Sequence, residues 1–414
     1  MNNIKTTVDE NESKVLGIKK IALVSCYLDD GDYGTILNDC FIEEFVCNED
    51  HFYHRIAKSL SLQGLEPVVI YPSIIKQTKT FQHKYGHDVI RIHAKKIPFF
   101  HEPIIYSPEL VKKIQEFDIC HFVSGYYVMY KVPDLFDYCV SKIHNKIPIV
   151  ARWAGGNYNW LFPIRKTIKK KSLEKCHEII CSGKDETNIL ETKFEIPKNK
   201  IKFLMNPIDL SLFQKREKIE ICKKLKQDPK FDYLLYIGRL VENKGIENVL
   251  SAFNKISKKQ SNIKLIIIGS GPLELEIKEF VEKNQLHDSI LLKGQMTHNE
   301  ICYYYNIASI LINATVNSGG LPNVVIEAMA SVVPVIATDF GAARDFVNEK
   351  KHTGILIKNY DSQSIESAIL KILNNKNKFS EFNHKILEQF SFENFGKELV
   401  EIYKDAYFNF KRQK

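Results

Sequence analysis

Two cations that could bind a phosphorylated ligand follow a short apolar run in the second half of the chain. The apolar run from Tyr233 to Ile237 ends at Gly238, Arg239 follows at once, and Lys244 stands directly before Gly245. A parallel strand of an open α/β sheet brings such side chains to the crevice at its carboxyl end, where these sheets bind ligands. Two fixed cations beside a helix start suit a diphosphate. The segment therefore predicts a site for a nucleotide-linked substrate.

A second candidate binding segment lies further along the same half. Gly319 and Gly320 let a backbone approach a ligand closely, and Pro322 suits the first turn of a helix. The amides at that helix start would present the favourable end of the helix dipole to a diphosphate. Glu327, one turn after Asn323, offers a carboxylate that can accept from both hydroxyls of a ribose. An isolated glutamate would be an ordinary surface acid, but these neighbours favour ligand binding.

The elements that must position these residues follow from the hydrophobic pattern. Short apolar runs alternate with helical patterns throughout, which predicts repeated β-α units and parallel sheets. Turn residues at Asn206–Asp209 and a lysine-rich stretch to Lys230 mark a boundary. We predict an α/β chain with two doubly wound, Rossmann-like domains, whose carboxyl-edge loops face an interdomain cleft. The predicted ranges are a polar tail at 1–17, domains at 18–210 and 211–390, and a C-terminal helix at 391–414 that packs back toward the first domain.

The composition agrees with two globular domains. The chain has 414 residues, of which 44% are hydrophobic and 26% charged. No apolar run is long enough to span a bilayer, and the polar N-terminus lacks the apolar centre of a signal peptide. The nine cysteines are scattered without a CxxC pair, which argues against a disulfide scaffold and structural zinc. We therefore expect a cytoplasmic protein.

The net charge of +8 is unevenly placed. One expected helix carries six basic residues and a single acid, Glu174; the basic residues are Arg165, Lys166, Lys169, Lys170, Lys171 and Lys175. This helix is either a solvated face or a patch that contacts anionic lipid or an acidic acceptor. The run has no groove-reading motif or interleaved stacking aromatics, so we do not expect nucleic acid as a partner.

Several segments, in order, resemble the retaining glycosyltransferases of family 4, which have the GT-B fold. They are NPID at 206–209, GRLVENKG at 238–245, IIIGSGP at 266–272, LKGQM at 292–296 and GGLPNVVIEAMA at 319–330. The resemblance implies transfer of a sugar from a nucleoside diphosphate, with Arg239 and Lys244 gripping the diphosphate as catalytic residues. It also implies a set of donor-binding residues: Gly238, Gly269, Gln295, Met296, Gly319, Gly320, Leu321, Pro322, Asn323 and Glu327.

The chain departs from the family pattern at two positions. The family's donor motif carries two glutamates seven residues apart; the second corresponds to Glu327, but Gly319 stands at the first. In the family that first carboxylate helps to hold the donor sugar, a contact for which Gly319 supplies no side chain. Val332 stands where glycine is usual.

The expected chemistry needs no metal and no cofactor beyond a UDP- or GDP-sugar as donor. Breaking a glycosyl–phosphate bond leaves negative charge on the diphosphate, which fixed cations stabilise. In the family the acceptor enters on the face that the diphosphate leaves, without a protein nucleophile. One formal metal motif, Asp30-Gly31-Asp32, could ligate Mg²⁺ or Mn²⁺, but a solvated turn is favoured and no metal is predicted.

The first half resembles the family's acceptor domain less closely. Gly34 lies where the family's opening glycine loop falls, and His121 ends a strand, where it either faces the cleft or is a buried structural histidine. Trp153 belongs to a loop that holds both tryptophans, whose rings could pack on sugars, contact lipid headgroups or fill the core. Ala154 occupies the place of a family histidine, which leaves Arg152 and Asn157 as polar acceptor-side candidates.

The leading hypothesis is an enzyme that moves a sugar from a nucleoside diphosphate to a glycan or lipid-linked acceptor in the synthesis of a surface polysaccharide or glycoconjugate. The alternative is a catalytically weak or inactive GT-B subunit that binds a nucleotide or a partner. Gly319 and Ala154 motivate this second reading. Peripheral contact with the inner face of a membrane would follow from the basic helix.

Overall fold

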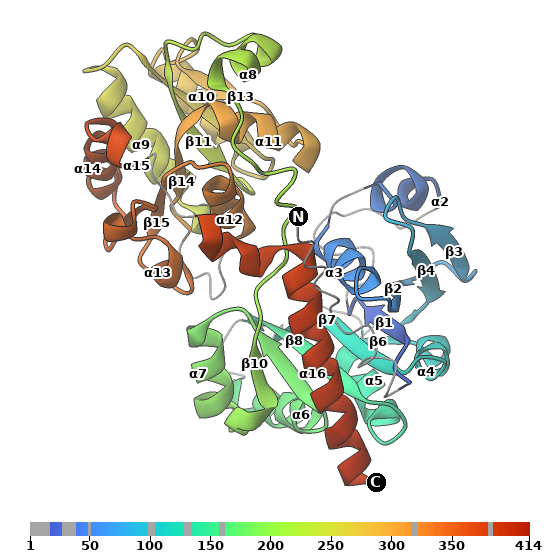
Figure 1. Cartoon of the computed structure of the whole chain (residues 1–414). Coiled ribbons are helices and arrows are strands. Elements are labelled where there is room, and N and C mark those ends of the chain that lie inside the picture. Colours follow the sequence, from blue (N-terminus) through green and yellow to red (C-terminus); the bar gives the residue numbers. More distant parts are fainter. Residues whose placement is uncertain are drawn as a thin grey trace, which may run out of the picture. The chain divides into compact units, whose positions relative to one another are not determined.

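The computed structural model describes residues 17–26, 39–48, 51–97, 104–127, 134–156, 162–315, 322–379 and 384–414. Its contacts divide the chain into two compact units (Figure 1). The first unit comprises Met1–Ser182, Glu186–Pro207 and Phe392–Lys414, and the second comprises Gly183–Asp185 and Ile208–Ser391. The last segment of the chain thus returns to the first unit.

The first unit is built on an eight-stranded sheet with the order β10-β9-β8-β7-β1-β2-β4-β3. All neighbours are parallel except β3 and β4, which form an antiparallel hairpin. The strands are β1 (Lys20–Val24), β2 (Glu66–Ser73), β3 (Lys79–Gln82), β4 (Asp88–His93), β7 (Ile119–Tyr127), β8 (Ile149–Gly156), β9 (Glu178–Cys181) and β10 (Ile201–Phe203). A separate antiparallel pair consists of β5 (Lys95–Ile97) and β6 (Ile104–Tyr106).

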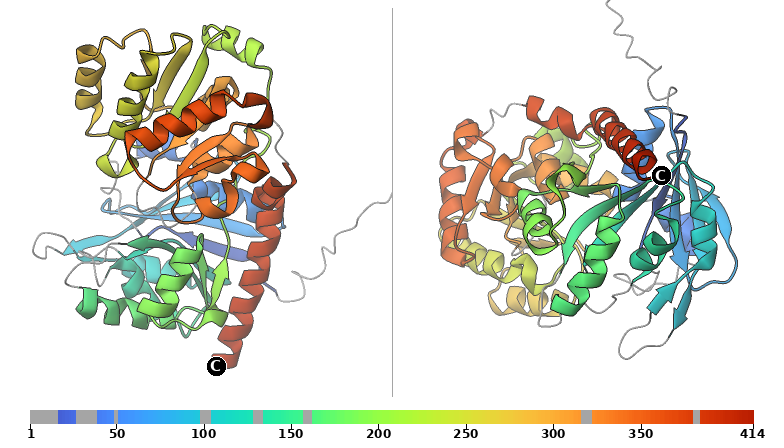
Figure 2. Two further views of the ribbon diagram at one scale, coloured as in Figure 1. Left: turned by 90° about the vertical axis from the view of Figure 1, so that its left-hand side faces the viewer. Right: turned by 90° about the horizontal axis from the view of Figure 1, so that it is seen from below.

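Helices cover both faces of this sheet. Ala22 and Val24 of β1 pack in the core on the side of α4 (Pro108–Ile114), α5 (Leu135–Ile143), α6 (Phe162–Glu174) and α7 (Lys184–Lys193). Ile21 and Leu23, the alternate residues, pack on the side of α3 (Phe52–Ser61) and the long C-terminal helix α16 (Phe392–Gln413). Figure 2 shows α16 running along the sheet. Burial on both faces explains why the parallel strands read as continuous apolar runs.

Three short elements complete the described part of the first unit. They are α2 (Asp39–Phe41), the π-helix η1 (Ile42–Val46) and the 3₁₀ turn η2 (Lys198–Lys200). Asp39 forms ion pairs with Lys79 of β3 and Arg91 of β4. These pairs tie α2 to the hairpin at the edge of the sheet.

The second unit has a six-stranded parallel sheet with the order β13-β12-β11-β14-β15-β16. Its strands are β11 (Asp232–Ile237), β12 (Ile263–Ile268), β13 (Ile290–Leu292), β14 (Ala308–Asn313), β15 (Val335–Thr338) and β16 (Gly354–Ile357). From β11 the chain builds outward to β13 and then returns to place β14 on the other side of β11. The gap between β11 and β14 is therefore the topological switch point of this sheet, the place where open α/β sheets bind ligands.

The helices of the second unit lie between its strands in the chain. The α-helices are α8 (Lys218–Leu225), α9 (Ile246–Ser257), α10 (Glu274–Lys283), α11 (His298–Ile307), α12 (Asn323–Ala330), α13 (Ala343–Phe346), α14 (Ser362–Leu373) and α15 (Lys376–Phe379). The 3₁₀ segments are η3 (Glu242–Lys244), η4 (Glu349–Lys351) and η5 (His384–Phe390). Apolar residues of α9, α10 and α14 pack with Leu234 and Leu265 in one core, whereas α11 and α12 contact β14.

Two further properties bear on the sequence analysis. No helix in the described ranges combines the length and apolar composition needed to cross a bilayer. All nine cysteines carry free thiols, and seven of them are buried. The hydrophobic pattern did not predict β3, β5 or β6, which have only three or four residues each. Such short antiparallel strands lack the long apolar run that identifies a buried parallel strand.

Candidate donor-binding site

The loop after β11 holds the two cations that the sequence singled out. Lys244 ends the 3₁₀ turn η3, and its N–H donates to Val241 O at 3.0 Å. The hydroxyl of Tyr236, a buried residue of β11, lies 3.4 Å from the carbonyl oxygens of both Arg239 and Lys244 and shares its single proton between them. One buried side chain thus anchors the backbone of both cationic residues.

Gly245 brings this loop into direct contact with the end of β14. Its φ is +67°, and a Cβ at this position would lie 2.4 Å from the carbonyl oxygen of Ala314. A Cβ–oxygen separation this short is far inside ordinary contact, so only glycine fits without movement of a neighbour. Lys244 therefore stands beside the residue that follows β14, at the switch point of the sheet.

The two cations are close enough to influence one another. Burial lowers the pKa of the half-buried Lys244, and the neighbouring charge of Arg239 lowers this pKa further. An anion that binds between the two side chains relieves the repulsion between their positive charges and stabilises the partly desolvated ammonium of Lys244. Because Arg239 is exposed on the same loop, the pair can offer charged donors to a diphosphate.

The next two loops lie against the cationic loop. The N–H of Leu240 donates to Ser270 O at 2.9 Å, and the N–H of Gly269 donates to Gly294 O at 2.8 Å. A Cβ on Gly269 would lie 1.9 Å from Gly238 O, so these backbones touch. Gln295 is exposed on the loop after β13, and its Oε1 accepts from Ser270 Oγ at 3.5 Å. Met296 follows and is half-buried.

Glu327 is a buried residue of α12 rather than a surface acid. The helix starts at Asn323, with Pro322 at the N-cap, and Glu327 is 2% exposed. Its Oε2 accepts from the hydroxyl of Tyr305 at 2.9 Å, and its Oε1 lies 3.6 Å from Nε2 of His298. The surface alternative is therefore excluded, while binding of a ribose by this carboxylate stays a prediction.

His298 and Tyr305, which were not predicted from the sequence, also lie at Glu327. They stand seven residues apart on α11 and reach the same carboxylate. This spacing places two side chains on one face of a helix, which is the signal that the sequence contained. Nothing in the sequence showed that this face turns toward α12.

Several candidate residues lie outside the described ranges. They are Gly34, Asn157, Gly319, Gly320 and Leu321, together with the formal metal motif Asp30-Gly31-Asp32. Their roles stay predictions.

His121 is a buried structural residue. It is fully buried on β7, and its Nδ1 lies 2.9 Å from the hydroxyl of Tyr403 on α16. Burial lowers the pKa of His121 to about 3, and the charge of Arg152 contributes to this shift. The neutral ring joins the sheet to α16, so the expectation that His121 faces the cleft is wrong and its buried alternative holds.

Arg152 and Trp153 also lie inside the first unit. Nη2 of Arg152 donates to Ser182 Oγ at 2.7 Å and to Leu204 O at 3.0 Å. Trp153 is 2% exposed and packs edge to face on Phe194, with the ring centroids 5.0 Å apart. Neither side chain is accessible to a sugar, so the structure contradicts the prediction that they contact the acceptor. Arg152 forms hydrogen bonds inside the first unit, and Trp153 packs in its core.

The basic helix α6 is largely neutralised by its neighbours. Lys169 is 1% exposed, and its ammonium lies 2.8 Å from Asp134 and 3.0 Å from Asp137 of the α5 region. Lys166 and Lys170 both pair with Glu195. Of the basic side chains described on this segment, Lys171 and Lys175 remain exposed. The patch is therefore smaller than the sequence indicated.

Comparison with known proteins addresses the region that carries the cation pair. Residues 217–389 match the family of glycosyl transferases group 1. The matched range lies within the second unit. Over 179 residues the chain is 31% identical to the alpha-monoglucosyldiacylglycerol synthase of Streptococcus pneumoniae, covering 42% of this chain and 38% of that protein. The chain thus spans less than half the length of this curated relative.

Solved structures resemble the whole chain. Sucrose-phosphate synthase from Thermosynechococcus elongatus aligns over 94% of this chain and 99% of its own, with a TM-score of 0.71 and 18% identity. HepE from Anabaena, in complex with UDP, aligns over 93% of this chain and 99% of its own, with a TM-score of 0.67 and 13% identity. At these identities the likeness shows the fold. It confirms the predicted GT-B architecture of two Rossmann-like domains.

Proposed function

We propose that the protein is a retaining glycosyltransferase that moves a sugar from a nucleoside-diphosphate sugar to a glycan or lipid-linked acceptor. The observation that carries this proposal is the placement of Arg239 and Lys244 on one loop at the β11–β14 switch point, inside the domain that matches the group 1 glycosyl transferases. A diphosphate is the ligand best suited to two neighbouring cations at the carboxyl edge of a parallel sheet.

The proposed mechanism uses these cations on the leaving group. As the bond between the anomeric carbon and the diphosphate oxygen breaks, the electron pair stays on the diphosphate. Arg239 and Lys244 stabilise the growing negative charge without a metal. The acceptor hydroxyl forms the new bond on the same face of the sugar and loses its proton to the departing diphosphate. Losing one fixed donor at such a site costs about 3–4 kcal/mol of transition-state stabilisation.

Glu327 is proposed to bind the ribose of the donor. The Tyr305 hydroxyl holds one carboxylate oxygen, and His298 lies beside the other. Each carboxylate oxygen has two lone pairs, so Glu327 can accept hydrogen bonds from ribose hydroxyls in addition to its contacts with Tyr305 and His298. Gln295 and Met296, on the loop after β13, are proposed to contact the nucleobase.

The test is turnover of a panel of UDP- and GDP-sugars by the purified full chain. We expect release of the nucleoside diphosphate from one donor, slow without acceptor and faster with one. Lys244→Ala should lower the rate by roughly 100- to 1000-fold. Lys283→Ala, at an exposed lysine that ends α10, is the matched control and should leave the rate unchanged. The anomeric configuration of the product, read by NMR, tests retention, and activity after treatment with a chelator tests metal independence.

An inactive subunit on the same scaffold is the alternative that Gly319 motivates, because glycine supplies no carboxylate for the donor sugar. The same experiment separates the two readings. Nucleotide binding that Lys244→Ala abolishes, without turnover of any donor, would identify the subunit. If no donor of the panel is bound or turned over, the proposal that this loop binds a nucleotide sugar is refuted.

We further infer a cytoplasmic protein with peripheral contact to anionic lipid through the segment Arg165–Lys175. The exposed side chains of Lys171 and Lys175 support this inference, and the pairing of Lys166 and Lys170 with Glu195 weakens the attraction. Flotation with vesicles that contain or lack anionic lipid tests it. We expect binding to anionic vesicles only, reduced in the double variant of Lys171→Gln and Lys175→Gln. Equal failure with both vesicle types would end the idea.

A further inference from the structure

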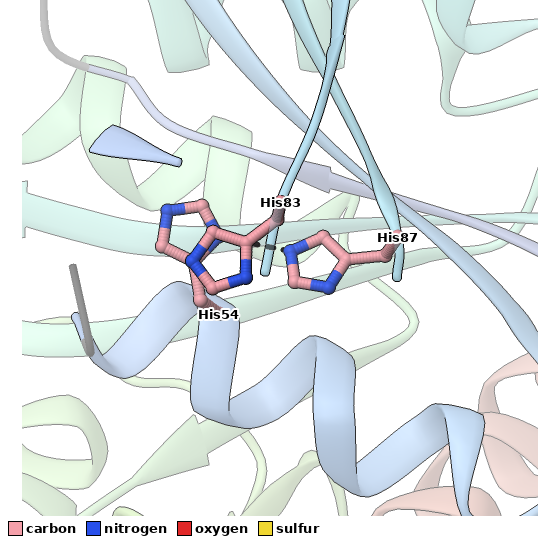
Figure 3. A group of neighbouring side chains, drawn as sticks. All are labelled: His54, His83 and His87. Carbon is pink, nitrogen blue, oxygen red and sulfur yellow. Dashed lines mark hydrogen bonds between the residues drawn. The ribbon is translucent and has the colours of Figure 1, made fainter. Parts of the chain in front are cut away.

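Three buried histidines meet at one edge of the first unit and share no residue with the proposed donor site. His54 lies in the first turn of α3, and His83 and His87 flank the turn that joins β3 to β4 (Figure 3). Their exposed fractions are 0%, 3% and 4%. One imidazole nitrogen from each residue lies within 4.8 Å of the other two. The fold thus brings together three buried imidazoles from two separate segments of the chain, an arrangement that suggests a shared function.

The backbone around the cluster is well supported. The N–H of His83 donates to His87 O at 3.0 Å, and the N–H of Gly86 donates to His83 O at 2.8 Å. These bonds close the turn and set the two histidines side by side. The N–H of Lys84 donates to Cys47 O at 2.9 Å, which fastens the turn to the segment before α3. The cluster is therefore held on a fixed frame.

Hydrogen bonds assign the nitrogens that can offer lone pairs. The Tyr71 hydroxyl lies 3.2 Å from Nε2 of His54, so this nitrogen can carry the proton and leave Nδ1 as the acceptor. Nδ1 of His54 lies 2.9 Å from Nε2 of His87. Nδ1 of His83 accepts from the N–H of Tyr85 at 3.1 Å, so its lone pair is on Nδ1 as well. Nδ1 of His87 is buried and has no hydrogen-bond partner among the described residues.

We propose that His54, His83 and His87 form a binding site for one divalent transition-metal ion of the zinc type. The ligand atoms are Nδ1 of His54, Nδ1 of His83 and Nε2 of His87. Imidazole ligands suit zinc, copper, nickel and cobalt, whereas magnesium and calcium require oxygen ligands, which this cluster does not supply. Three protein ligands leave a further position for water.

The distance between Nδ1 of His54 and Nε2 of His87 fits coordination of one shared ion. Two nitrogens that each lie about 2.05 Å from a metal stand about 2.9 Å apart at a right angle and about 3.4 Å apart at the tetrahedral angle. The observed 2.9 Å between His54 and His87 falls at the near end of this range. On binding, the proton between these nitrogens moves to Nδ1 of His87, so both rings stay neutral and no net proton is released.

Metal binding also requires the rings to tilt. His83 stacks on His54 and His87, with centroids 3.9 and 4.6 Å apart and interplanar angles of 10° and 19°. Lone pairs lie in the ring planes, so the planes must turn toward a common point. His83 and His87 flank a turn, and coordination by His83 Nδ1 replaces a single hydrogen bond from Tyr85. Burial lowers the pKa of His54 and, to about 3, that of His87, so both rings present the neutral form that binds metals.

The proposed role is structural. The ion would clamp the β3–β4 turn to α3. These two elements also meet through ring stacking, one imidazole–imidazole hydrogen bond and the Lys58 ammonium, which lies 4.5 Å from the centroid of the Tyr85 ring. Because the site lies in the first unit and involves none of the donor residues, it is independent of the proposed transferase reaction. Its failure would leave that reaction untouched.

The experiment is calorimetric titration of the full chain with ZnCl₂ after removal of metals with a chelator. We expect one zinc ion per chain and a higher unfolding temperature of the first unit. Both tryptophans, at positions 153 and 160, fall in this unit and report its unfolding. The single variants His83→Gln and His87→Gln should weaken zinc binding by about tenfold or more. His287→Gln, at an exposed histidine outside the cluster, is the matched control and should bind as the unmodified chain does.

Cobalt substitution provides a readout that does not depend on a variant remaining folded. Cobalt bound by imidazoles gives weak visible bands, whereas a cysteine ligand adds intense thiolate charge-transfer absorption. We expect the imidazole spectrum alone, and MgCl₂ should produce no binding heat. The proposal is overturned by a thiolate spectrum, by the absence of saturable one-to-one zinc binding, or by zinc binding that a folded His83→Gln variant retains in full.

Discussion

Substitution of Gly245 by alanine tests the close approach that positions Lys244. The residue has a φ of +67°, a left-handed conformation that costs an alanine about 1–2 kcal/mol. The added Cβ would also lie 2.4 Å from Ala314 O and 2.9 Å from Ala314 Cβ, so the loop or the end of β14 must shift. Overpacking of this kind costs about 1–3 kcal/mol. We therefore expect Gly245→Ala to destabilise the second unit by about 2–5 kcal/mol.

Gly294→Ala is the matched control for backbone strain. Its φ is +68°, and no heavy atom lies within 4 Å of the added Cβ. Gly294→Ala should therefore lower the free energy of unfolding only by the cost of backbone strain, about 1–2 kcal/mol. The difference between the two variants, about 1–3 kcal/mol, then measures the contact between the cationic loop and β14.

The assay must follow the second unit, and tryptophan fluorescence does not, since both tryptophans belong to the first. Urea unfolding followed by far-UV circular dichroism reports both units, and subtraction of the fluorescence transition isolates the second. Equal destabilisation by the two substitutions would refute the reasoning, because it would mean that Ala314 does not restrict position 245. The donor affinity of Gly245→Ala should fall as well, since the substitution displaces Lys244.

Three further predictions concern single side chains. Tyr305→Phe removes the hydroxyl that orients Glu327, and it should weaken binding of the donor nucleotide by about 1 kcal/mol, measured by calorimetry. Lys169→Met leaves two carboxylates buried without their cation, so it should destabilise the first unit by about 3–5 kcal/mol in fluorescence-detected unfolding, while Lys171→Met at an exposed site should have no effect. Burial raises the pKa of Glu178 from 4.5 to about 7, so the folded chain binds more protons than the unfolded chain between these values. The stability of the first unit relative to Glu178→Gln should therefore fall as the pH rises through this window, and a constant difference would contradict the assignment.

The position of the cation pair on the sheet could be predicted from sequence because its determinants are local. Arg239 and Lys244 follow a buried strand within eight residues of chain, and the apolar run marks where that strand ends. The glycine at 245 signals a close backbone approach, although the partner, Ala314, is far away in sequence. Strand, turn and helix start are all encoded in one segment, so the sequence alone determined where these cations lie on the sheet.

Long-range partners were not predictable in the same way. The basic residues of α6 resemble a solvated face because their acids are remote: Asp134 and Asp137 belong to the preceding helix, and Glu195 follows the next one. The three histidines raise the same difficulty. His83 and His87 have the H-x₃-H spacing that occurs in zinc sites, but the third histidine, His54, lies far earlier in the chain. Only the packing of α3 against the β3–β4 turn brings it to the other two.

The errors on the acceptor side have one physical cause. His121, Arg152 and Trp153 lie within strands of a sheet that helices cover on both faces. On a half-exposed sheet, alternate strand residues face water, so a polar residue has an even chance of being accessible. On a doubly covered sheet both sets are buried, and a polar residue within the strand finds its hydrogen-bond partners inside the protein. His121 contacts Tyr403 in this way, and Arg152 contacts Ser182. The residues that bind ligands in such a fold lie beyond the last buried residue of each strand, and this is where the proposed donor residues Arg239 and Lys244 lie. The same rule applied to the first unit directs the search for acceptor contacts past the carboxyl ends of its strands, away from the polar residues inside them.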